Sequence, residues 1–147
     1  MPRVIALIPA RSGSKGIPNK NFRPLPDGST CMRRAVDCAL ASGIPEVIVS
    51  SDAYTMISGV HSGPCYDMTQ RPHREIERPQ WDVLHIPRPS ELAQDDSSML
   101  SVVQHALAQV PGDTDDIWVL LQPTQPLRTP AHIRAALDLL EASGADS

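Results

Sequence analysis

Short apolar runs rich in β-branched residues alternate along the chain with segments whose apolar residues recur at helical spacing. Continuous runs of this kind predict strands that are buried on both faces of a sheet. We expect such strands at Val4 to Pro9, Val47 to Val49, Trp81 to Ile86 and Ile117 to Leu121.

Three further segments have the apolar periodicity and the capping residues of helices. The first begins after Ser29 or Thr30, either of which can cap it, and runs to about Ala41. The second begins after Ser97 or Ser98 and carries Met99, Val103, Ala106 and Val110 at helical spacing. The third runs from Pro130 to Glu141, with Thr129 and Pro130 suited to the N-cap and first helical positions.

This alternation predicts an α/β fold with a mostly parallel sheet and helices on both faces. At 147 residues we expect one domain, residues 1–147, with an irregular insertion over 53–87 that ends in the strand at Trp81 to Ile86. Residues 53–80 are expected to be mostly loop. Ligands of such sheets bind beyond the carboxyl ends of the strands, where residues 9–21, 50–52 and 122–129 fall.

Composition narrows the possible partners. The formal net charge of −4 argues against a nucleic-acid groove or an anionic membrane surface. The apolar runs are too short to span a bilayer, and the first ten residues lack the pattern of a signal peptide. The three cysteines show no CxxC spacing, so we expect reduced thiols and a cytoplasmic protein.

The stretch after the first strand is the one that carries candidate chemistry. It combines Gly13 and Gly16 with Arg11 and with Lys15 and Lys20, which are the only lysines among the 13 basic residues of the chain. Glycines that let backbone N–H groups approach a ligand, together with fixed cations, are suited to cradling a polyphosphate. Neither the Walker A pattern nor GxGxxG is present, and a solvated surface loop is the alternative.

Four blocks resemble the CMP-sialic acid synthetases (acylneuraminate cytidylyltransferases): ARSGSKGIPNKN, IPEVIVSSD, RPSELAQDDSSML and VLLQPTQPLRT, in that order. The resemblance implies a nucleotide-diphosphosugar-transferase-like (Rossmann-like) fold. It also implies a Mg²⁺-dependent transfer of CMP from CTP to a 2-keto-3-deoxy sugar acid of the sialic type, a nonulosonic acid, with release of pyrophosphate. It further implies a homodimer for the full-length family form.

Family positions map onto this sequence residue by residue. The resemblance implies catalytic roles for Arg11 and Lys20 and a contact between Gln122 and the sugar acid or ribose. It implies nucleotide binding by Arg11, Ser12, Gly13, Ser14, Lys15, Gly16, Lys20, Asn21, Arg88 and Ser97. The metal ligands are unknown.

Nearby polar residues have other expected roles. Ser97 is also a natural N-cap, and Asp52 is expected to hydrogen-bond loop backbone rather than to hold a metal. Asp95 and Asp96 directly precede a helix and are expected to favour its dipole. Arg128 is not assigned to the site, because its segment leads into the Thr129 cap.

Two alternatives to this function stay open. One is a catalytically silent nucleotide-binding or assembly protein of the same family. The other is a cytidylyltransferase for another 3-deoxy sugar acid, such as legionaminate, pseudaminate or ketodeoxyoctulosonate. The chain is expected to lack the family's C-terminal part, which carries its Mg²⁺-binding carboxylates, and therefore to bind CTP weakly and make no CMP-sugar by itself.

Overall fold

Buried strands and amphipathic helices alternate in the structure as they do in the sequence pattern. The computed structural model describes residues 2–53, 65–67 and 82–145. Its elements are β1 (Val4–Pro9), α1 (Cys31–Ala41), β2 (Glu46–Ser51), β3 (Cys65–Asp67), β4 (Asp82–Pro87), the 3-10 turn η2 (Ser90–Leu92), α3 (Met99–Gln109), β5 (Ile117–Leu120) and α4 (Pro130–Ser143). The described strands form one five-stranded sheet in the order β3-β4-β2-β1-β5, with every pairing parallel.

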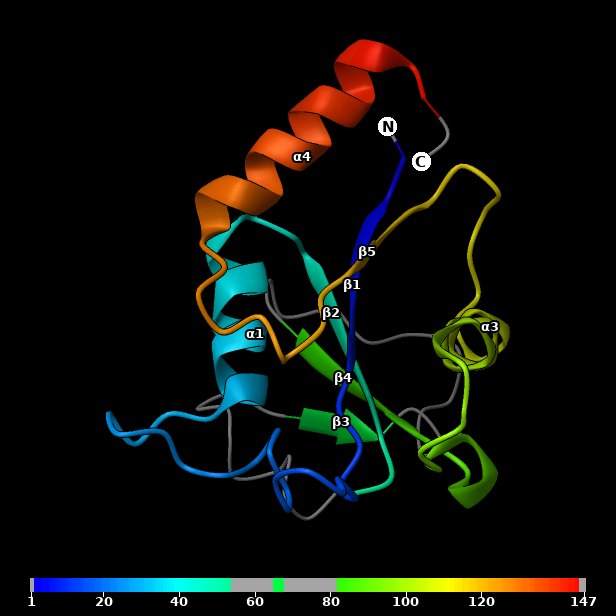
Figure 1. Cartoon of the computed structure of the whole chain (residues 1–147). Coiled ribbons are helices and arrows are strands. Elements are labelled where there is room, and N and C mark those ends of the chain that lie inside the picture. Colours follow the sequence, from blue (N-terminus) through cyan, green and yellow to red (C-terminus); the bar gives the residue numbers. More distant parts are fainter. Residues whose placement is uncertain (1, 54–64, 68–81, 146–147) are drawn as a thin grey trace.

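Helices cover both faces of this sheet, as predicted. Figure 1 shows α1 and α4 on one side and α3 on the other. Alternate residues of β1 serve the two faces: Ala6 and Ile8 belong to the core cluster beneath α1, whereas Ile5 and Leu7 belong to the cluster beneath α3. This double burial is the physical reason for the continuous apolar run of β1, because a strand covered on both faces has no solvent-facing side.

The predicted strands are confirmed with small shifts of their ends. β2 begins at Glu46, one residue before the apolar run, and β4 spans Asp82–Pro87, with Trp81 outside the described residues. Within the expected insertion at 53–87, the predicted final strand is confirmed as β4. The strand β3, which pairs with β4, differs from the expectation that residues 53–80 are mostly loop. The rest of the expected loop lies outside the described residues.

Caps mark the starts of the helices. Thr30 caps α1 and Thr129 caps α4, each through its side-chain oxygen. Of the two serines proposed for α3, Ser98 is the cap and accepts from the backbone N–H of Ser101. α4 continues two residues past the predicted end and closes on Gly144, whose φ of 63° favours glycine.

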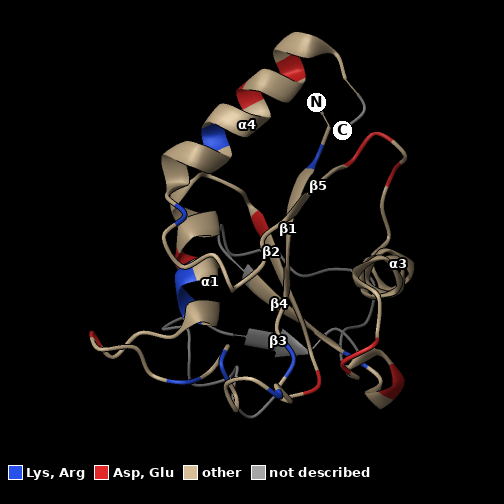
Figure 2. Cartoon of the chain, in the orientation of Figure 1, with Lys and Arg blue, Asp and Glu red and all other residues tan. Residues whose placement is uncertain are grey.

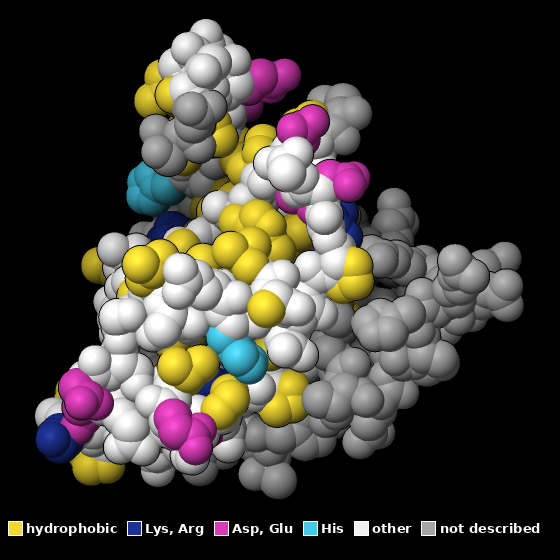
Figure 3. Space-filling view, turned by 90° about the vertical axis from the view of Figure 1, so that its right-hand side faces the viewer, with side chains coloured by type: hydrophobic (Ala, Val, Ile, Leu, Met, Phe, Trp, Pro, Cys, Tyr) yellow, Lys and Arg dark blue, Asp and Glu magenta, His cyan; other side chains and the backbone are white. Residues whose placement is uncertain are grey.

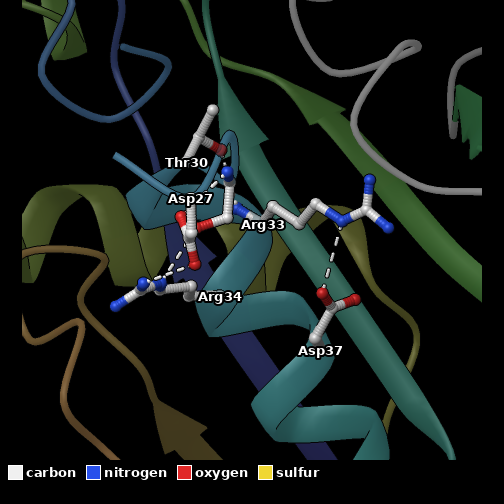
Figure 4. Close-up of polar contacts among 6 residues, drawn as sticks. Asp27, Thr30, Arg33, Arg34 and Asp37 are labelled. Carbon is white, nitrogen blue, oxygen red and sulfur yellow. Dashed lines mark hydrogen bonds and ion pairs between the residues drawn. The ribbon is translucent and has the colours of Figure 1, made fainter. Parts of the chain in front are cut away.

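Polar contacts hold the turn that leads into α1 (Figure 4). The carboxylate of Asp27 accepts from Ser29 and meets the guanidinium of Arg34 at 2.7 Å. One turn further on, Arg33 reaches Asp37 at 3.3 Å across an i,i+4 spacing. Hydrogen bonds from Ser29, and next in size from Arg34, hold the pKa of Asp27 well below its ordinary value of 3.8.

Asp27→Asn is expected to weaken the acid dependence of stability. Because the folded pKa of Asp27 lies below the unfolded one, its carboxylate stabilises the fold above pH 3.8, and this contribution is lost as the pH falls through the folded pKa. Urea unfolding at pH 6 and at pH 3 measures the difference in the free energy of unfolding. The variant should lose less stability than the wild type over this range, and an identical loss would contradict the assignment.

The sheet ends on one side at β5, and hydrophobic side chains are exposed near it. Leu120 on β5 is 41% exposed and Leu107 on α3 is 44% exposed. Figure 3 shows hydrophobic side chains gathered on this side of the molecule.

Within the described residues, no helix has both the length and the apolar character needed to cross a membrane.

One cleft lies away from the carboxyl ends of the strands. It has a volume of about 1830 Å³ and is lined by α4 residues, by the start of β1 and by residues 111–116, which precede β5. Its position at the amino-terminal edge separates it from the polar segments considered next.

Candidate functional site

Parallel pairing brings three polar segments to one edge of the sheet. β1 runs into the loop of residues 10–29, β2 ends before Asp52, and β4 ends before Arg88. Because β1, β2 and β4 are adjacent and parallel, their carboxyl ends meet at this edge. Figure 2 shows basic segments of the 10–29 loop there, beyond the ends of the strands. Two of the segments that the sequence pattern assigned to ligand binding, residues 9–21 and 50–52, are therefore neighbours in space, and Arg88 lies beside them.

Two sets of contacts hold the first half of the loop, one to the residue that follows β2 and one within the loop itself. The carboxylate of Asp52 accepts from the backbone N–H of Ser12 at 2.8 Å and from its hydroxyl at 2.7 Å. Asn21 is buried, and its side-chain N–H donates to the carbonyl of Arg11 at 3.1 Å. The predicted role of Asp52 in loop hydrogen bonding is confirmed. The first half of the loop is thus fixed at both of its ends.

Asp95 contacts two of the four cations in the 10–29 loop. Arg11 Nη2 lies 2.6 Å from Asp95 Oδ1, and Lys15 Nζ lies 2.9 Å from Asp95 Oδ2. Hydrogen bonds from Lys15, and next from Arg11, lower the pKa of the Asp95 carboxyl. The expected role of Asp95 beside the helix dipole did not include these contacts, in which its carboxylate is engaged by side chains from another segment.

Arg88 is a buried cation at the centre of the edge. Only 7% of the residue is exposed, and its guanidinium donates to the carbonyl of Ser50 at 2.8 Å and to the Ser50 hydroxyl at 3.2 Å. Burial lowers the pKa of Arg88; the nearby charge of Asp52 raises it and that of Arg11 lowers it further. The Arg88 side chain is therefore held against the end of β2.

The rest of the loop is open in this structure. A Cβ added to Gly13 or Gly16 would meet no atom within 4 Å, and neither glycine has a positive φ. Within the described residues, no hydrogen bond engages the backbone N–H groups of Gly13, Ser14, Lys15 or Gly16. Ser12 differs from the prediction here, because its N–H donates to Asp52 and is not free for a phosphate.

Lys20 is half-buried, and its side chain forms no ion pair with a described residue. Its backbone N–H closes a turn by donating to the carbonyl of Ile17 at 3.2 Å. The next residue, Asn21, has a buried side-chain oxygen with no hydrogen-bond partner in the part of the chain that is described. An unpartnered buried acceptor is costly, so this oxygen is a candidate contact for a ligand hydroxyl or amine.

Two predicted site residues make no described contact with the loop. Ser97 donates its hydroxyl to the carbonyl of Glu91 at 2.8 Å and so closes the turn between η2 and α3. Gln122 follows β5, beside the end of β1, and its carbonyl accepts from Arg128 Nη2 at 3.2 Å. Arg128 also contacts the side chain of Gln125 and therefore holds the 122–128 loop.

Sequence reasoning missed Ser50 and the ion-pair role of Asp95. Ser50 was expected only as part of a strand end, but it is the buried partner of Arg88. The three segments predicted to meet at the carboxyl edge, residues 9–21, 50–52 and 122–129, do not include Asp95. The signal for its contact was charge complementarity, because an acid in the block that resembles the family lies opposite the cations of the loop.

The described residues do not present a prepared metal site. They contain no group of three or more His, Cys, Asp or Glu side chains placed to hold a metal ion. The two carboxylates nearest the loop have both oxygens engaged, Asp52 by Ser12 and Asp95 by Arg11 and Lys15. These residues therefore do not fit a magnesium ion as they stand, and no ligand is assigned.

Comparison with known proteins confirms the predicted resemblance. A family model described as Cytidylyltransferase matches residues 5–57. The chain is 34% identical over 143 residues to the N-acylneuraminate cytidylyltransferase of Escherichia coli O18:K1:H7, covering 95% of this chain and 28% of that protein. It is 30% identical over 146 residues to the CMP-N,N'-diacetyllegionaminic acid synthase of Legionella pneumophila, covering 97% of this chain and 55% of that protein.

Solved structures share the fold. A CMP:2-keto-3-deoxy-manno-octonic acid synthetase complexed with CTP superposes with a TM-score of 0.66 at 20% identity, over 97% of this chain and 49% of that one. A Mycobacterium tuberculosis protein in complex with manganese gives a TM-score of 0.56 at 20% identity, over 95% and 60%. The chain spans less than a third of the length of the N-acylneuraminate cytidylyltransferases of Escherichia coli and Streptococcus agalactiae that it matches.

Proposed function

We propose that the chain, which is similar to the N-acylneuraminate cytidylyltransferases, serves the transfer of CMP from CTP to a sugar acid of the sialic type. The observation that carries this proposal is the cluster of cations at the carboxyl edge of the sheet. Arg11 and Lys15 converge on one acidic group there, and the loop that bears them has open backbone N–H groups. Such a set binds a phosphate chain.

In the proposed reaction the anomeric hydroxyl of the sugar acid attacks the α-phosphorus of CTP. The bond from the α-phosphorus to the bridging oxygen breaks, pyrophosphate leaves with the electron pair, and the hydroxyl proton is released. Arg11, Lys15 and Lys20 neutralise the charge that grows on the phosphate oxygens, as phosphoryl transfer requires. No covalent nucleophile is needed for this step, because the sugar hydroxyl itself attacks.

The nucleoside is proposed to lie beside Asn21 and Arg88. Asn21 offers its buried, unpartnered side-chain oxygen as an acceptor for a ribose hydroxyl or the cytosine amine. The Arg88 side chain is fixed by its hydrogen bonds to Ser50. These bonds fix the start of the segment that follows β4 and runs to Ser97. Edge contacts from these residues would read the base, which the phosphates alone cannot identify.

The sugar acid is proposed to contact Gln122, at the end of β5 next to β1. A nonulosonic acid of the sialic or legionaminic type is favoured by the two relatives named above. Mg²⁺ is proposed to enter with the phosphates of CTP, which would supply oxygen ligands. A cytoplasmic location and a homodimer of the full-length protein complete the proposal.

Pyrophosphate release tests this function. The protein is mixed with CTP, Mg²⁺ and each of several sugar acids: N-acetylneuraminate, a legionaminate, a pseudaminate and ketodeoxyoctulosonate. We expect CTP-dependent pyrophosphate release and a CMP-sugar with at least one nonulosonic acid when this chain is joined to the C-terminal part found in the curated relatives. Binding of CTP without release from any acid would favour the silent nucleotide-binding alternative.

A further inference from the structure

The carboxylate of Asp95 lies between two cations of the 10–29 loop. Asp95 receives Arg11 on one oxygen at 2.6 Å and Lys15 on the other at 2.9 Å. Arg11 also donates to the carbonyl of Ala93 at 3.4 Å, two residues before Asp95. A phosphate group offers the same cations more oxygens and more negative charge, so it would bind in the same position more strongly.

The contacts of Asp95 are reachable from solvent. The side chain of Lys15 is 87% exposed and that of Asp95 is 33% exposed, and ion pairs of this kind contribute little to stability. The loop keeps its anchors to Asp52 and Asn21 when Asp95 moves away. Displacement of Asp95 by an incoming anion would therefore leave the cations in place.

We propose that Asp95 is an internal competitor for the phosphate position formed by Arg11 and Lys15, so that a polyphosphate binds only by displacing it. This inference rests on the proposed function and concerns the selectivity of the same site. A weakly charged anion gains too little from the two cations to replace an attached carboxylate, whereas a polyphosphate gains enough. The return of Asp95 to the cations then assists the release of pyrophosphate.

The charge state of Asp95 supports a permanent competitor. Hydrogen bonds from Lys15 and Arg11 lower its pKa, so the carboxylate is negatively charged at neutral pH. Its neighbour Asp96 is exposed and forms no ion pair with a described residue. Asp95 and Asp96 are adjacent and carry the same charge, but only Asp95 contacts the cations of the loop.

The test compares Asp95→Asn with Asp96→Asn by titration calorimetry, using inorganic pyrophosphate, CTP and cytidine as probes, with and without Mg²⁺. Asp95→Asn is expected to bind pyrophosphate roughly three- to tenfold more tightly than the wild type and cytidine equally well. Asp96→Asn is expected to match the wild type for both probes. Asp95→Ser, which also removes the charge, should behave like Asp95→Asn.

Unchanged or weaker pyrophosphate binding by both Asp95 variants would overturn the proposal. If the Asp95 variants lose pyrophosphate affinity only when Mg²⁺ is present, Asp95 binds the metal instead. If Asp96→Asn gains as much pyrophosphate affinity as Asp95→Asn, the effect is one of general charge. Either result also overturns the proposal. If the wild type binds CTP but the Asp95 variants do not bind pyrophosphate more tightly, the proposed role of Asp95 is wrong and the proposed function stands. If neither CTP nor pyrophosphate binds to the wild type or the variants, both fail.

Discussion

Arg11→Ala is expected to weaken CTP binding by about 1.5–3 kcal/mol, which is the typical loss for a charge-assisted hydrogen bond. The guanidinium is partly buried and lies just beyond the end of β1, where it contacts Asp95. Lys20→Ala is expected to act in the same direction. Titration calorimetry with CTP and Mg²⁺ measures both variants against the wild type.

A matched control for this change is Arg33→Ala. Arg33 also pairs with one aspartate, but it does so on the surface of α1 through Asp37. It should leave CTP affinity unchanged. Wild-type affinity in both Arg11→Ala and Lys20→Ala would remove the basis for a phosphate cradle in this loop.

Arg88→Ala is expected to lower the free energy of unfolding by about 1–3 kcal/mol and to reduce the preference for cytosine. The side chain is buried against β2, so its removal leaves a cavity and takes a donor away from Ser50. Urea unfolding measures the first effect, and competition between CTP and UTP measures the second.

Arg88→Met separates packing from recognition at this position. Methionine fills much of the same volume without a charge, so it should recover most of the lost stability. It should not recover the preference for CTP over UTP. If Arg88→Met retains the wild-type preference, Arg88 contributes only to packing and the base is read elsewhere.

The fold could be predicted because its strands are buried on both faces. The apolar runs of β1 and β2 are buried on both faces of the sheet. In a chain that also contains amphipathic helices, such runs indicate parallel strands covered by helices on both sides. The strand β3 could not be predicted in the same way. It is three residues long and stands among prolines and charges, so its pairing with β4 depends on the sheet already present.

The candidate site could be predicted as a set of segments but not as a set of contacts. The strand pattern predicted that residues 9–21, 50–52 and 122–129 lie at the carboxyl edge, because a parallel sheet makes that outcome general. Residues 88 and 97 entered the predicted site only through the resemblance to the family. Which acid meets which cation depends on loop conformation. The pairing of Asp95 with Arg11 and the burial of Arg88 on Ser50 are tertiary contacts without a local signature.

The most direct test of the central claim, that the carboxyl edge of this sheet is a cytidine triphosphate site, is a calorimetric titration of the wild-type chain. CTP, UTP and ATP are each titrated at the same concentration of Mg²⁺. The account predicts saturable binding of CTP with a clear preference over the other two nucleotides, because Arg11 and Lys15 bind phosphate while the segment after Arg88 reads the base. Equal affinities for all three, or no binding of CTP, would contradict it.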